Sequence, residues 1–328
     1  MLSEILKGFI PIDANKLRFP GFVKKNRQQI QTGVENVKKG KGWQDPNKEC
    51  PVCNCKERSI LFCRFDINYF QCGGCGCAYV EKFPVDTSDI YSDEGYEEIA
   101  KNAYLGNVDY RKQRFGLERL ELIGRYLEKS PACSSMLDVG CGTGWFLETA
   151  IENGYNVTGM EYGKDLASFT ANRLGIRVLV DSLQNIKEDL RFDIITMFDV
   201  IEHVVNPKEL IKSMYHFLNP GGIGVIFTPN LDSFAIQHLK ENSSAVIPVH
   251  HPFLFHEPSL RKIVEDEGFE VVYCSTKGTD ILDVYVHYRD ILDQQQVADF
   301  LRENCDALQA MVDTAGCGNH MRFVVRKE

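Results

Sequence analysis

The sequence predicts an α/β fold, a parallel sheet with helices on both faces, preceded by a small cysteine-rich module. From Ser135 onward, short apolar runs alternate with longer segments of helical pattern, as in sheets built from strand–helix–strand units. A glycine-rich turn follows the first of these runs, and seven of the twelve cysteines fall between Cys50 and Cys77. A chain of 328 residues accommodates one large domain together with a smaller one.

The apolar runs define the expected strands, and the segments between them define the expected helices. Strands are predicted at Met136–Val139, Val157–Met160, Val178–Val180, Ile194–Phe198, Gly224–Thr228, 269–275 and Met321–Val325. Helices are predicted at Arg114–Glu128, Trp145–Asn153, Lys164–Leu174, Pro207–Leu218, 258–268 and 288–315, with a further one around Lys24–Lys38.

These elements divide the chain into four parts. They are a basic leader (1–45), the cysteine module (46–83), a helical linker (84–134) and the sheet domain (135–328). Within the sheet domain we expect a long segment after the fifth strand (230–257) and a helical insertion (276–320). Neither the leader nor the insertion matches a pattern with a known role.

Charge is unevenly distributed along the chain. Residues 1–80 hold 13 Lys and Arg against 7 Asp and Glu, a charge of +6, so the remainder of a chain with net charge −9 carries −15. An acidic main domain disfavours nucleic acid as a partner, because phosphate-backbone binding relies on clustered Lys and Arg. The basic leader either meets a phosphate or acidic surface or is simply solvated. No apolar run is long enough to span a bilayer, and the N-terminus lacks secretory-signal features.

The cysteine spacing predicts a structural zinc site. Cys50-Pro-Val-Cys53 and Cys72-Gly-Gly-Cys75 have the C-x2-C…C-x2-C pattern in which two short loops deliver four thiolates to one tetrahedral ion. Cys55 and Cys77 each follow a pair by two residues, which leaves open a six-thiolate cluster or an iron–sulfur cluster. Clustered cysteines without a secretory signal indicate a reducing compartment, and we expect a cytoplasmic protein.

The glycine-rich turn predicts a ligand site. Leu137-Asp138-Val139 leads into Gly140-x-Gly142-x-Gly144, so a strand ends in glycines just before a helix begins. Glycines permit a tight turn and let a ligand approach the backbone near the positive end of the helix. The spacing differs from the Gly-x-Gly-x-x-Gly of dinucleotide sites. A carboxylate at Asp138 suits an ammonium or hydroxyl partner better than a pyrophosphate.

Two further acids follow the next two strands. Glu161 stands where a carboxylate can accept hydrogen bonds from both ribose hydroxyls, and Asp181 where one can accept from an adenine amino group. Both could alternatively be helix caps or solvated loop charges. The three acids at successive strand ends together predict a nucleoside site.

These motifs are similar to those of a known enzyme family. Residues 135–230 resemble the class I (Rossmann-like) S-adenosylmethionine-dependent methyltransferases, and among them the ubiquinone-biosynthesis O-methyltransferases and the sugar and natural-product methyltransferases. The matching stretches are LDVGCGTGWFLE, VTGMEYG, FDIITMFDVIEHVVNP and LNPGGIGVIFTPN. The cysteine segment resembles the zinc-ribbon leaders of bacterial polysaccharide and natural-product methyltransferases, and Tyr91 and Tyr96 fit that pattern loosely.

The resemblance implies a fold and a cofactor. It implies a seven-stranded, mostly parallel sheet whose last strand, Met321–Val325, is antiparallel, and linker helices that cover the cofactor. The residues expected to bind S-adenosylmethionine are Asp138, Gly140, Cys141, Gly142, Gly144, Glu161, Tyr162, Asp181, Ser182, Phe198 and Asp199.

The end of the fourth strand and a later histidine group supply the candidate catalysts. Glu202 and His203 lie next to the expected methyl group, and histidine is suited to accept a proton from a hydroxyl. The resemblance implies a divalent-ion site here, although the shorter Asp199 replaces a glutamate. Alternatively, Glu202 and His203 hold the following helix. In His250-His251-Pro-Phe-Leu-Phe-His256, His251 is the candidate for a catalytic role, while His256 could instead cap a helix and His250 be exposed.

The sequence is compatible with three functions. The first is methylation of a small molecule, chiefly O-methylation of a sugar, nucleotide-sugar or related polysaccharide or natural-product precursor, with C- or N-methylation as the alternative. The second is an RNA methyltransferase that uses the zinc module to bind RNA, which the basic leader permits and the acidic remainder opposes. The third is a cofactor-binding scaffold without enzymatic activity.

Overall fold

The computed structural model describes residues 5–6, 9–13, 16, 30–35, 39, 48–83 and 107–328. Within the helix predicted around Lys24–Lys38, residues 30–35 are helical and the flanking positions largely lie outside the described residues. Tyr91 and Tyr96 also lie outside them. Among the described residues, every helix is too short or too polar to cross a bilayer.

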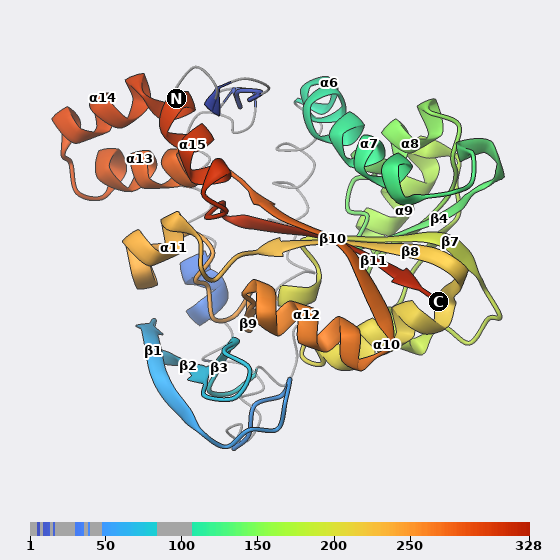
Figure 1. Cartoon of the computed structure of the whole chain (residues 1–328), viewed down its shortest axis with the longest axis horizontal. Coiled ribbons are helices and arrows are strands. Elements are labelled where there is room, and N and C mark those ends of the chain that lie inside the picture. Colours follow the sequence, from blue (N-terminus) through green and yellow to red (C-terminus); the bar gives the residue numbers. More distant parts are fainter. Residues whose placement is uncertain are drawn as a thin grey trace.

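A seven-stranded sheet forms the centre of the main domain (Figure 1). Its strands are β4 (Ser135–Val139), β5 (Asn156–Met160), β6 (Val178–Leu179), β7 (Phe192–Phe198), β8 (Leu218–Pro229), β10 (Phe269–Lys277) and β11 (His320–Lys327). They lie in the order β10-β11-β8-β7-β4-β5-β6. β4 to β8 pair in parallel, and β11 runs antiparallel to both β8 and β10. The predicted mostly parallel, seven-stranded sheet with an antiparallel last strand is confirmed.

Helices cover both faces of this sheet. Figure 1 shows α7, α8 and α9 on one side and α10 and α12 on the other. These helices are α6 (Val108–Arg111), α7 (Leu117–Tyr126), α8 (Trp145–Glu152), α9 (Lys164–Leu174), α10 (Pro207–Phe217) and α12 (Glu257–Asp266), and a π-helical turn (Lys112–Gly116) joins α6 to α7. Because both faces are covered, β7 buries six of its seven residues, as expected of a central parallel strand.

Local sequence sets the helix starts. Asn206 caps α10 by accepting a hydrogen bond from the Glu209 N–H, and Pro207 occupies the first turn, where its missing N–H costs nothing. His256 caps α12 in a reciprocal pair with Ser259, which confirms the helix-capping alternative for this histidine. Short 3-10 turns lie at Pro131–Cys133, Leu183–Asn185, Ile201–His203 and Lys240–Asn242.

A second, four-stranded sheet joins the cysteine module to the main domain. Its strands are β1 (Arg58–Arg64), β2 (Ile67–Cys72), β3 (Ala78–Val80) and β9 (Phe253–Leu254), in that order. The first three belong to the module, whereas β9 belongs to the segment 230–257 that follows β8. Buried residues of the module and of the main domain also form one continuous hydrophobic cluster. The module is therefore packed into the main domain.

The helical insertion begins earlier than the sequence suggested. In place of one helical stretch at 288–315 there are three helices, α13 (Asp280–Asp290), α14 (Gln295–Glu303) and α15 (Cys305–Thr314), and α11 (Phe234–Leu239) packs against α13. Asp280, in the first turn of α13, is buried. Its carboxylate accepts hydrogen bonds from the backbone N–H groups of Ala235 and Asn319 and from the Gln309 amide.

Candidate active site

The glycine turn follows β4 and leaves one side open. Gly140, Gly142 and Gly144 have φ values of +72°, +54° and +75°, which other residues rarely adopt. A Cβ at Gly140 would lie 2.8 Å from Val200, and one at Gly144 would lie 2.6 Å from Thr170, so packing requires both glycines. A Cβ at Gly142 would meet nothing within 4 Å. The backbone at Gly142 therefore faces open space that a ligand can occupy.

Glu161 lies against this turn. Its carboxylate accepts the Gly142 N–H at 2.9 Å and the Gly163 N–H at 3.1 Å, one on each oxygen. A carboxylate has about four lone-pair positions, so each oxygen retains capacity for a ribose hydroxyl. Asp181 accepts from the Ser182 N–H at 2.6 Å and from the Asn185 side chain at 2.8 Å. Tyr162, the neighbour of Glu161, is exposed.

Asp138 and Cys141 point into the interior. Asp138 is buried and accepts a hydrogen bond from the Thr196 hydroxyl at 2.6 Å. Burial raises its pKa to about 7, so a cationic partner would be needed to keep it fully ionised at neutral pH. The Cys141 side chain packs in the core beneath the turn, so only its backbone faces the open side.

Arg119 on α7 is a candidate site residue that the sequence did not indicate. Its guanidinium lies 3.8 Å from the ring centre of Phe198 and 4.8 Å from that of Trp145, within reach of cation–π attraction. Burial lowers its pKa to about 10, and the carboxylates of Asp199 and Asp138 oppose that shift. A cation thus lies against the ring of the predicted cofactor residue Phe198 and within electrostatic range of Asp138 and Asp199. It was missed because no motif joins the linker helix to the strand ends.

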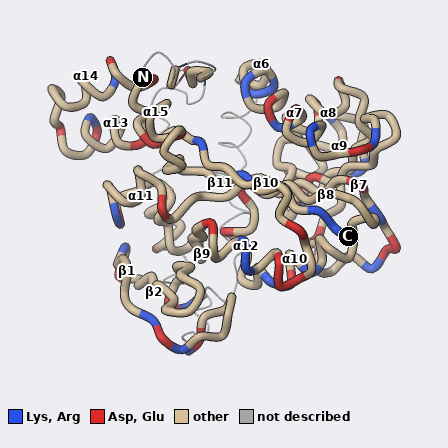
Figure 2. The backbone as a smooth tube through the Cα atoms, in the orientation of Figure 1, with Lys and Arg blue, Asp and Glu red and all other residues tan. Residues whose placement is uncertain are grey.

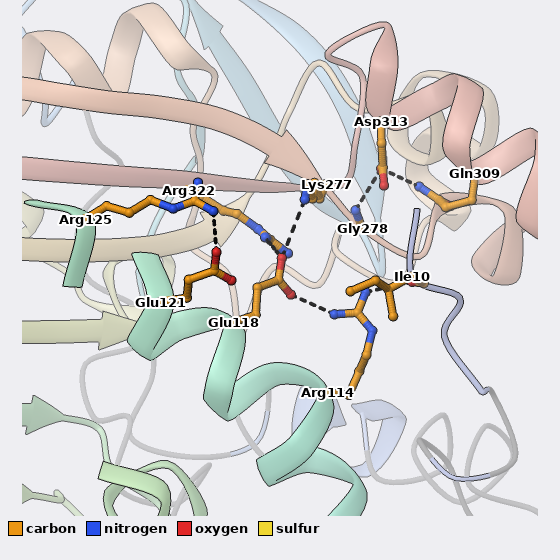
Figure 3. A network of polar contacts seen from close by, with 10 residues as sticks. All are labelled: Ile10, Arg114, Glu118, Glu121, Arg125, Lys277, Gly278, Gln309, Asp313 and Arg322. Atoms are coloured by element: carbon orange, nitrogen blue, oxygen red, sulfur yellow. Dashed lines mark hydrogen bonds and ion pairs between the residues drawn. The ribbon is translucent and has the colours of Figure 1, made fainter. Parts of the chain in front are cut away.

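A network of ion pairs fixes α7 in place (Figure 3). The Glu118 carboxylate contacts Arg322 of β11, Lys277 of β10 and Arg114, and Arg114 also donates to the Ile10 carbonyl. Burial opposes ionisation of Glu118, yet these three cations hold its pKa below its usual range. Because Glu118 precedes Arg119, the network also fixes where Arg119 enters the site.

Asp199 pairs with a histidine from the far end of the chain. It has a φ of +58° at the end of β7, and its carboxylate lies 3.0 Å from His320 Nε2 at the start of β11. The other His320 nitrogen contacts the Asn319 side-chain oxygen at 3.0 Å, and that oxygen already accepts from the Thr279 N–H. Both ring nitrogens therefore face acceptors, which favours the imidazolium.

Asp199 and His320 each stabilise the charged form of the other. Partial burial opposes ionisation of Asp199, whose side chain is 47% exposed, but His320 outweighs it and holds the Asp199 pKa at about 2. Burial likewise disfavours the charged form of His320, and Asp199 outweighs this and raises its pKa. Sequence patterns gave no sign of His320, because its place beside β7 follows from the antiparallel insertion of β11.

Glu202, His203 and His251 come together beside Asp199. One ligand atom of each lies within 4.8 Å of the others, and the two imidazole ring centres are 4.6 Å apart. The Nδ1 atoms of His203 and His251 face the carbonyls of His250 and Ala245 at 2.6 and 2.7 Å. A carbonyl only accepts, so Nδ1 carries the proton and Nε2 is the basic nitrogen of each ring.

Glu202 completes this group, which we name the acceptor cluster (Glu202, His203 and His251). One Glu202 oxygen accepts from the Thr228 hydroxyl at 2.9 Å, and the other is buried with no hydrogen-bond partner among the described residues. It lies 3.8 Å from His203 Nε2. Burial, with Asp199 nearby, raises the pKa of Glu202 well above its usual range. The Glu202 and His203 side chains thus contact β8 and the 250–251 segment.

Burial keeps both histidines of the acceptor cluster neutral. It lowers the pKa of His203 to about 3, with His251 and His250 contributing, and it also lowers the pKa of His251. His250 itself is half-buried rather than exposed. A buried carboxylate oxygen without a donor and two neutral imidazoles are suited to accept a proton or to bind a cation.

The two cysteine pairs form matching knuckles. In the first, the Asn54 N–H donates to the Cys50 carbonyl and the Cys50 N–H to that of Cys55, and Gly76, Cys72 and Cys77 repeat this pattern in the second. Asn54 and Gly76 both have positive φ, at 58° and 75°. A Cβ at Gly76 would lie 2.6 Å from the His256 ring, so this position requires glycine.

The four predicted ligands fit a zinc ion. The sulfurs of Cys50, Cys53, Cys72 and Cys75 lie within 4.8 Å of one another, with Cys50–Cys75 at 3.6 Å and Cys53–Cys72 at 3.4 Å. Zn–S bonds of about 2.3 Å in a tetrahedron place sulfurs about 3.8 Å apart, close to these values. When bound, zinc would cross-link the two knuckles through these thiolates. Cys77 lies 3.5 Å from Cys50 and from Cys75 on the buried side.

Removal of zinc is expected to loosen the module in the full chain. Thiolates without the ion repel one another, and metal binding and folding are coupled in such knuckles. Treatment with a chelator should raise hydrogen exchange across 48–83, whereas β4 and β7 keep their protection. Cys72→Ser should reproduce the effect, and Cys63→Ser, which removes an exposed cysteine of β1, should not. Unchanged exchange across 48–83 after chelation would exclude a structural metal.

Comparison with known proteins agrees with this geometry. The family model for the methyltransferase domain matches residues 110–273, half of the chain. Ubiquinone biosynthesis O-methyltransferases are 33% identical over 106 residues in Pseudomonas aeruginosa and 31% identical over 138 residues in Coxiella burnetii. These matches cover 30% and 38% of this chain, and only 46% and 58% of the relatives' own lengths.

A solved structure shows the same fold. The plantazolicin methyltransferase BpumL, in complex with SAH, aligns with a TM-score of 0.50 and 16% identity, over 74% of this chain and 93% of its own. The seven-stranded sheet, the open glycine turn and the matched family model converge on one assignment. The chain belongs to the class I S-adenosylmethionine-dependent methyltransferases.

Proposed function

We propose that the protein transfers a methyl group from S-adenosylmethionine to a hydroxyl of a small molecule. The observation that carries this proposal is the acceptor cluster, which lies at the same edge of the sheet as the open glycine turn. Ligands of open α/β sheets bind at the carboxyl ends of the strands, where β4, β5 and β7 end. A proton acceptor beside a methyl donor is the arrangement that O-methylation needs.

The residues around the turn would hold the cofactor. Gly142 offers open backbone, Glu161 offers acceptors for ribose hydroxyls, and Asp138 offers a carboxylate for an ammonium group. Arg119 adds a cation suited to a carboxylate. When bound, the cofactor supplies a sulfonium-activated methyl group. These residues orient it.

The acceptor cluster would take the proton from the hydroxyl. His251 Nε2 is basic because the Ala245 carbonyl holds the proton on Nδ1. The Glu202 carboxyl lies within 4.8 Å of a ring nitrogen of each histidine, and its raised pKa favours the protonated form, so the imidazoles are the open proton acceptors. His320, held as an imidazolium by Asp199, adds positive charge that stabilises a developing alkoxide.

The same cluster would also suit a divalent ion. Two imidazoles and a carboxylate are common ligands for such ions, and the unpartnered Glu202 oxygen is a ready donor. Asp199, which the sequence comparison placed near the ion, is paired with His320 instead. If an ion is required, addition of Mn²⁺ to the zinc-loaded protein should raise turnover in the wild type but not in Glu202→Gln. Turnover that is independent of added Mn²⁺ would leave the proton-acceptor role alone.

We extend the proposal to sugar, nucleotide-sugar and related polysaccharide or natural-product precursors as acceptors. The zinc-ribbon resemblance supports this class, whereas the relatives' names refer to ubiquinone biosynthesis. Turnover measured with labelled cofactor against paired panels of sugars and ubiquinone precursors separates the two. Transfer to oxygen in either panel supports the hydroxyl proposal. Transfer only to carbon or nitrogen would overturn it.

The other two functions make different predictions. Lys and Arg are interspersed with Asp and Glu along α6 to α12 (Figure 2), which gives RNA no extended basic track among the described residues. Salt-dependent retention of RNA would favour the RNA alternative. Tight cofactor binding without turnover on any acceptor would favour the scaffold.

The pH dependence of turnover should show where the base titrates. A base acts while unprotonated, and burial has lowered the pKa of His203 to about 3 and that of His251 below its ordinary value. At saturating cofactor, kcat should therefore not fall as pH drops through 6.5, the ordinary histidine pKa. Saturation is needed because protonation of Asp138, whose pKa is about 7, would weaken cofactor binding. A loss of kcat centred near 6.5 would contradict the buried-base assignment.

The same shifts affect stability, and the groups act in opposite directions. Below about pH 6.5 the unfolded chain binds protons that His203 and His251 do not, so these two groups lower the free energy of unfolding as pH falls, whereas Asp138, with its raised pKa, acts in the opposite sense. Circular dichroism at each pH identifies the range in which the kcat measurement applies.

A further inference from the structure

We propose that the cysteine module is a supporting part of the active site, because two of its side chains, Tyr69 and Arg64, position His251. This inference rests on the proposed role of His251 in proton transfer. It gives the module a role in orienting a catalytic side chain, in addition to any role in stabilising the fold.

The module first fixes the backbone that follows His251. β3 pairs antiparallel with β9, so that Ala78 faces Leu254 and Tyr79 faces Phe253. The Val80 N–H donates to the Pro252 carbonyl at 3.0 Å, which extends the ladder to the residue next to His251. Segment 252–254 is therefore the last strand of the module's own sheet.

Tyr69 then fixes the His251 residue itself. Its hydroxyl donates to the His251 carbonyl at 2.7 Å, and Tyr69 has no exposed surface. Burial raises the Tyr69 pKa further, so the hydroxyl stays a donor. Because Tyr69 has no exposed surface, its hydroxyl depends on an acceptor inside the protein, and the His251 carbonyl provides it.

Arg64 controls the direction of the His251 ring. Its Nη1 donates to the carbonyls of Ser243 and Val246 at 2.7 and 2.6 Å, which clamps the turn 243–246. The Ala245 carbonyl of that turn accepts the His251 Nδ1 proton at 2.7 Å. The clamp thus sets both the tautomer and the orientation of the ring, and so the direction in which Nε2 points.

Together these contacts make Tyr69 and Arg64 positioning residues. They reach His251 through its backbone and through its ring partner, and neither belongs to the acceptor cluster. Displacement of a catalytic group by about 1 Å costs up to about 100-fold in rate, so such contacts matter to chemistry even when the fold persists.

The direct test observes the His251 ring in the zinc-loaded full chain labelled with ¹⁵N-histidine. Tyr69→Phe and Arg64→Met should shift the His251 ring signals, and Arg64→Met should also populate the other tautomer. Tyr79→Phe is the matched control, because it removes a hydroxyl from the neighbouring strand β3 of the same sheet, where the nearby charged group is Arg58 rather than His251. Arg58→Met controls for the loss of a module arginine.

Turnover supplies the second readout through a double-mutant cycle. Tyr69→Phe should lower kcat about 10-fold, within the range that misplacement of a catalytic group produces, while the affinity for S-adenosylhomocysteine stays within about twofold. In a His251→Asn background the same change should lower kcat no further, because Tyr69 acts through His251. Equal losses in both backgrounds would show that Tyr69 acts through stability and would overturn the proposal.

The two readouts separate this inference from the proposed function. Unchanged His251 signals in both Tyr69→Phe and Arg64→Met would overturn the positioning role whatever the activity. Shifted signals together with unaltered turnover in His251→Asn would uphold the positioning of His251 and reject its role in proton transfer. Hydrogen exchange of each variant confirms that the module remains folded.

Discussion

Replacement of Gly142 with arginine is expected to abolish binding of S-adenosylmethionine. A side chain at Gly142 would enter the open space above the turn, and the φ of +54° is already unfavourable for other residues. The Gly142 N–H also holds Glu161 at 2.9 Å, so a shifted backbone would displace the predicted ribose acceptor. We expect a loss of more than about 100-fold in calorimetric affinity, which corresponds to about 2.7 kcal/mol.

Gly154→Arg is the matched control for this variant. Gly154 has a φ of +85° and its Cβ would also meet nothing within 4 Å, but it lies between α8 and β5, at the opposite edge of the sheet. Both variants add the same charge and similar backbone strain. Unchanged cofactor affinity in Gly142→Arg, or an equal loss in Gly154→Arg, would count against the turn as the cofactor site.

His203→Ala is expected to reduce turnover far more than cofactor affinity. His203 lies in the acceptor cluster, 3.8 Å from the Glu202 oxygen, rather than at the glycine turn. Like His251, His203 offers a basic Nε2 in this cluster, and loss of a general base typically costs about 10² to 10⁴ in rate. We therefore expect kcat to fall by at least about 100-fold while the affinity for S-adenosylhomocysteine changes less than about threefold.

His216→Asn controls for the loss of a histidine, because His216 is exposed on α10. A parallel loss of kcat and cofactor affinity in His203→Ala would instead indicate a structural role. His203 contacts the His250 carbonyl at 2.6 Å, so hydrogen exchange of 250–254 should be followed in the same variant.

The sequence predicted the parts of the fold that repeat a local pattern. β4, β5 and β7 were identified because their apolar runs are buried on both faces, and the glycine turn because strand, glycines and helix are contiguous. Glu202, His203 and His251 were proposed together, and the structure places them in one cluster. For these residues, the residue type and the position after a strand both indicated a place in the site.

Other features depend on contacts between distant segments. Arg119 reaches the cofactor residues from the linker, and His320 reaches Asp199 across 121 positions. The pairing of β3 with β9 joins the module to the 230–257 segment, and two-residue β9 carries no strand signal of its own. Sequence periodicity indicates which positions of a single element are buried, so it does not predict contacts between distant segments.

We propose that the turn at Gly140–Gly144 and Glu161 bind the cofactor with its sulfur toward the acceptor cluster. A crystal structure with S-adenosylhomocysteine is the direct test of this arrangement. We expect the nucleoside above Gly142, its ribose hydroxyls on Glu161 and its sulfur facing His203 and His251. A nucleoside bound elsewhere, or with its sulfur directed away from these histidines, would contradict it.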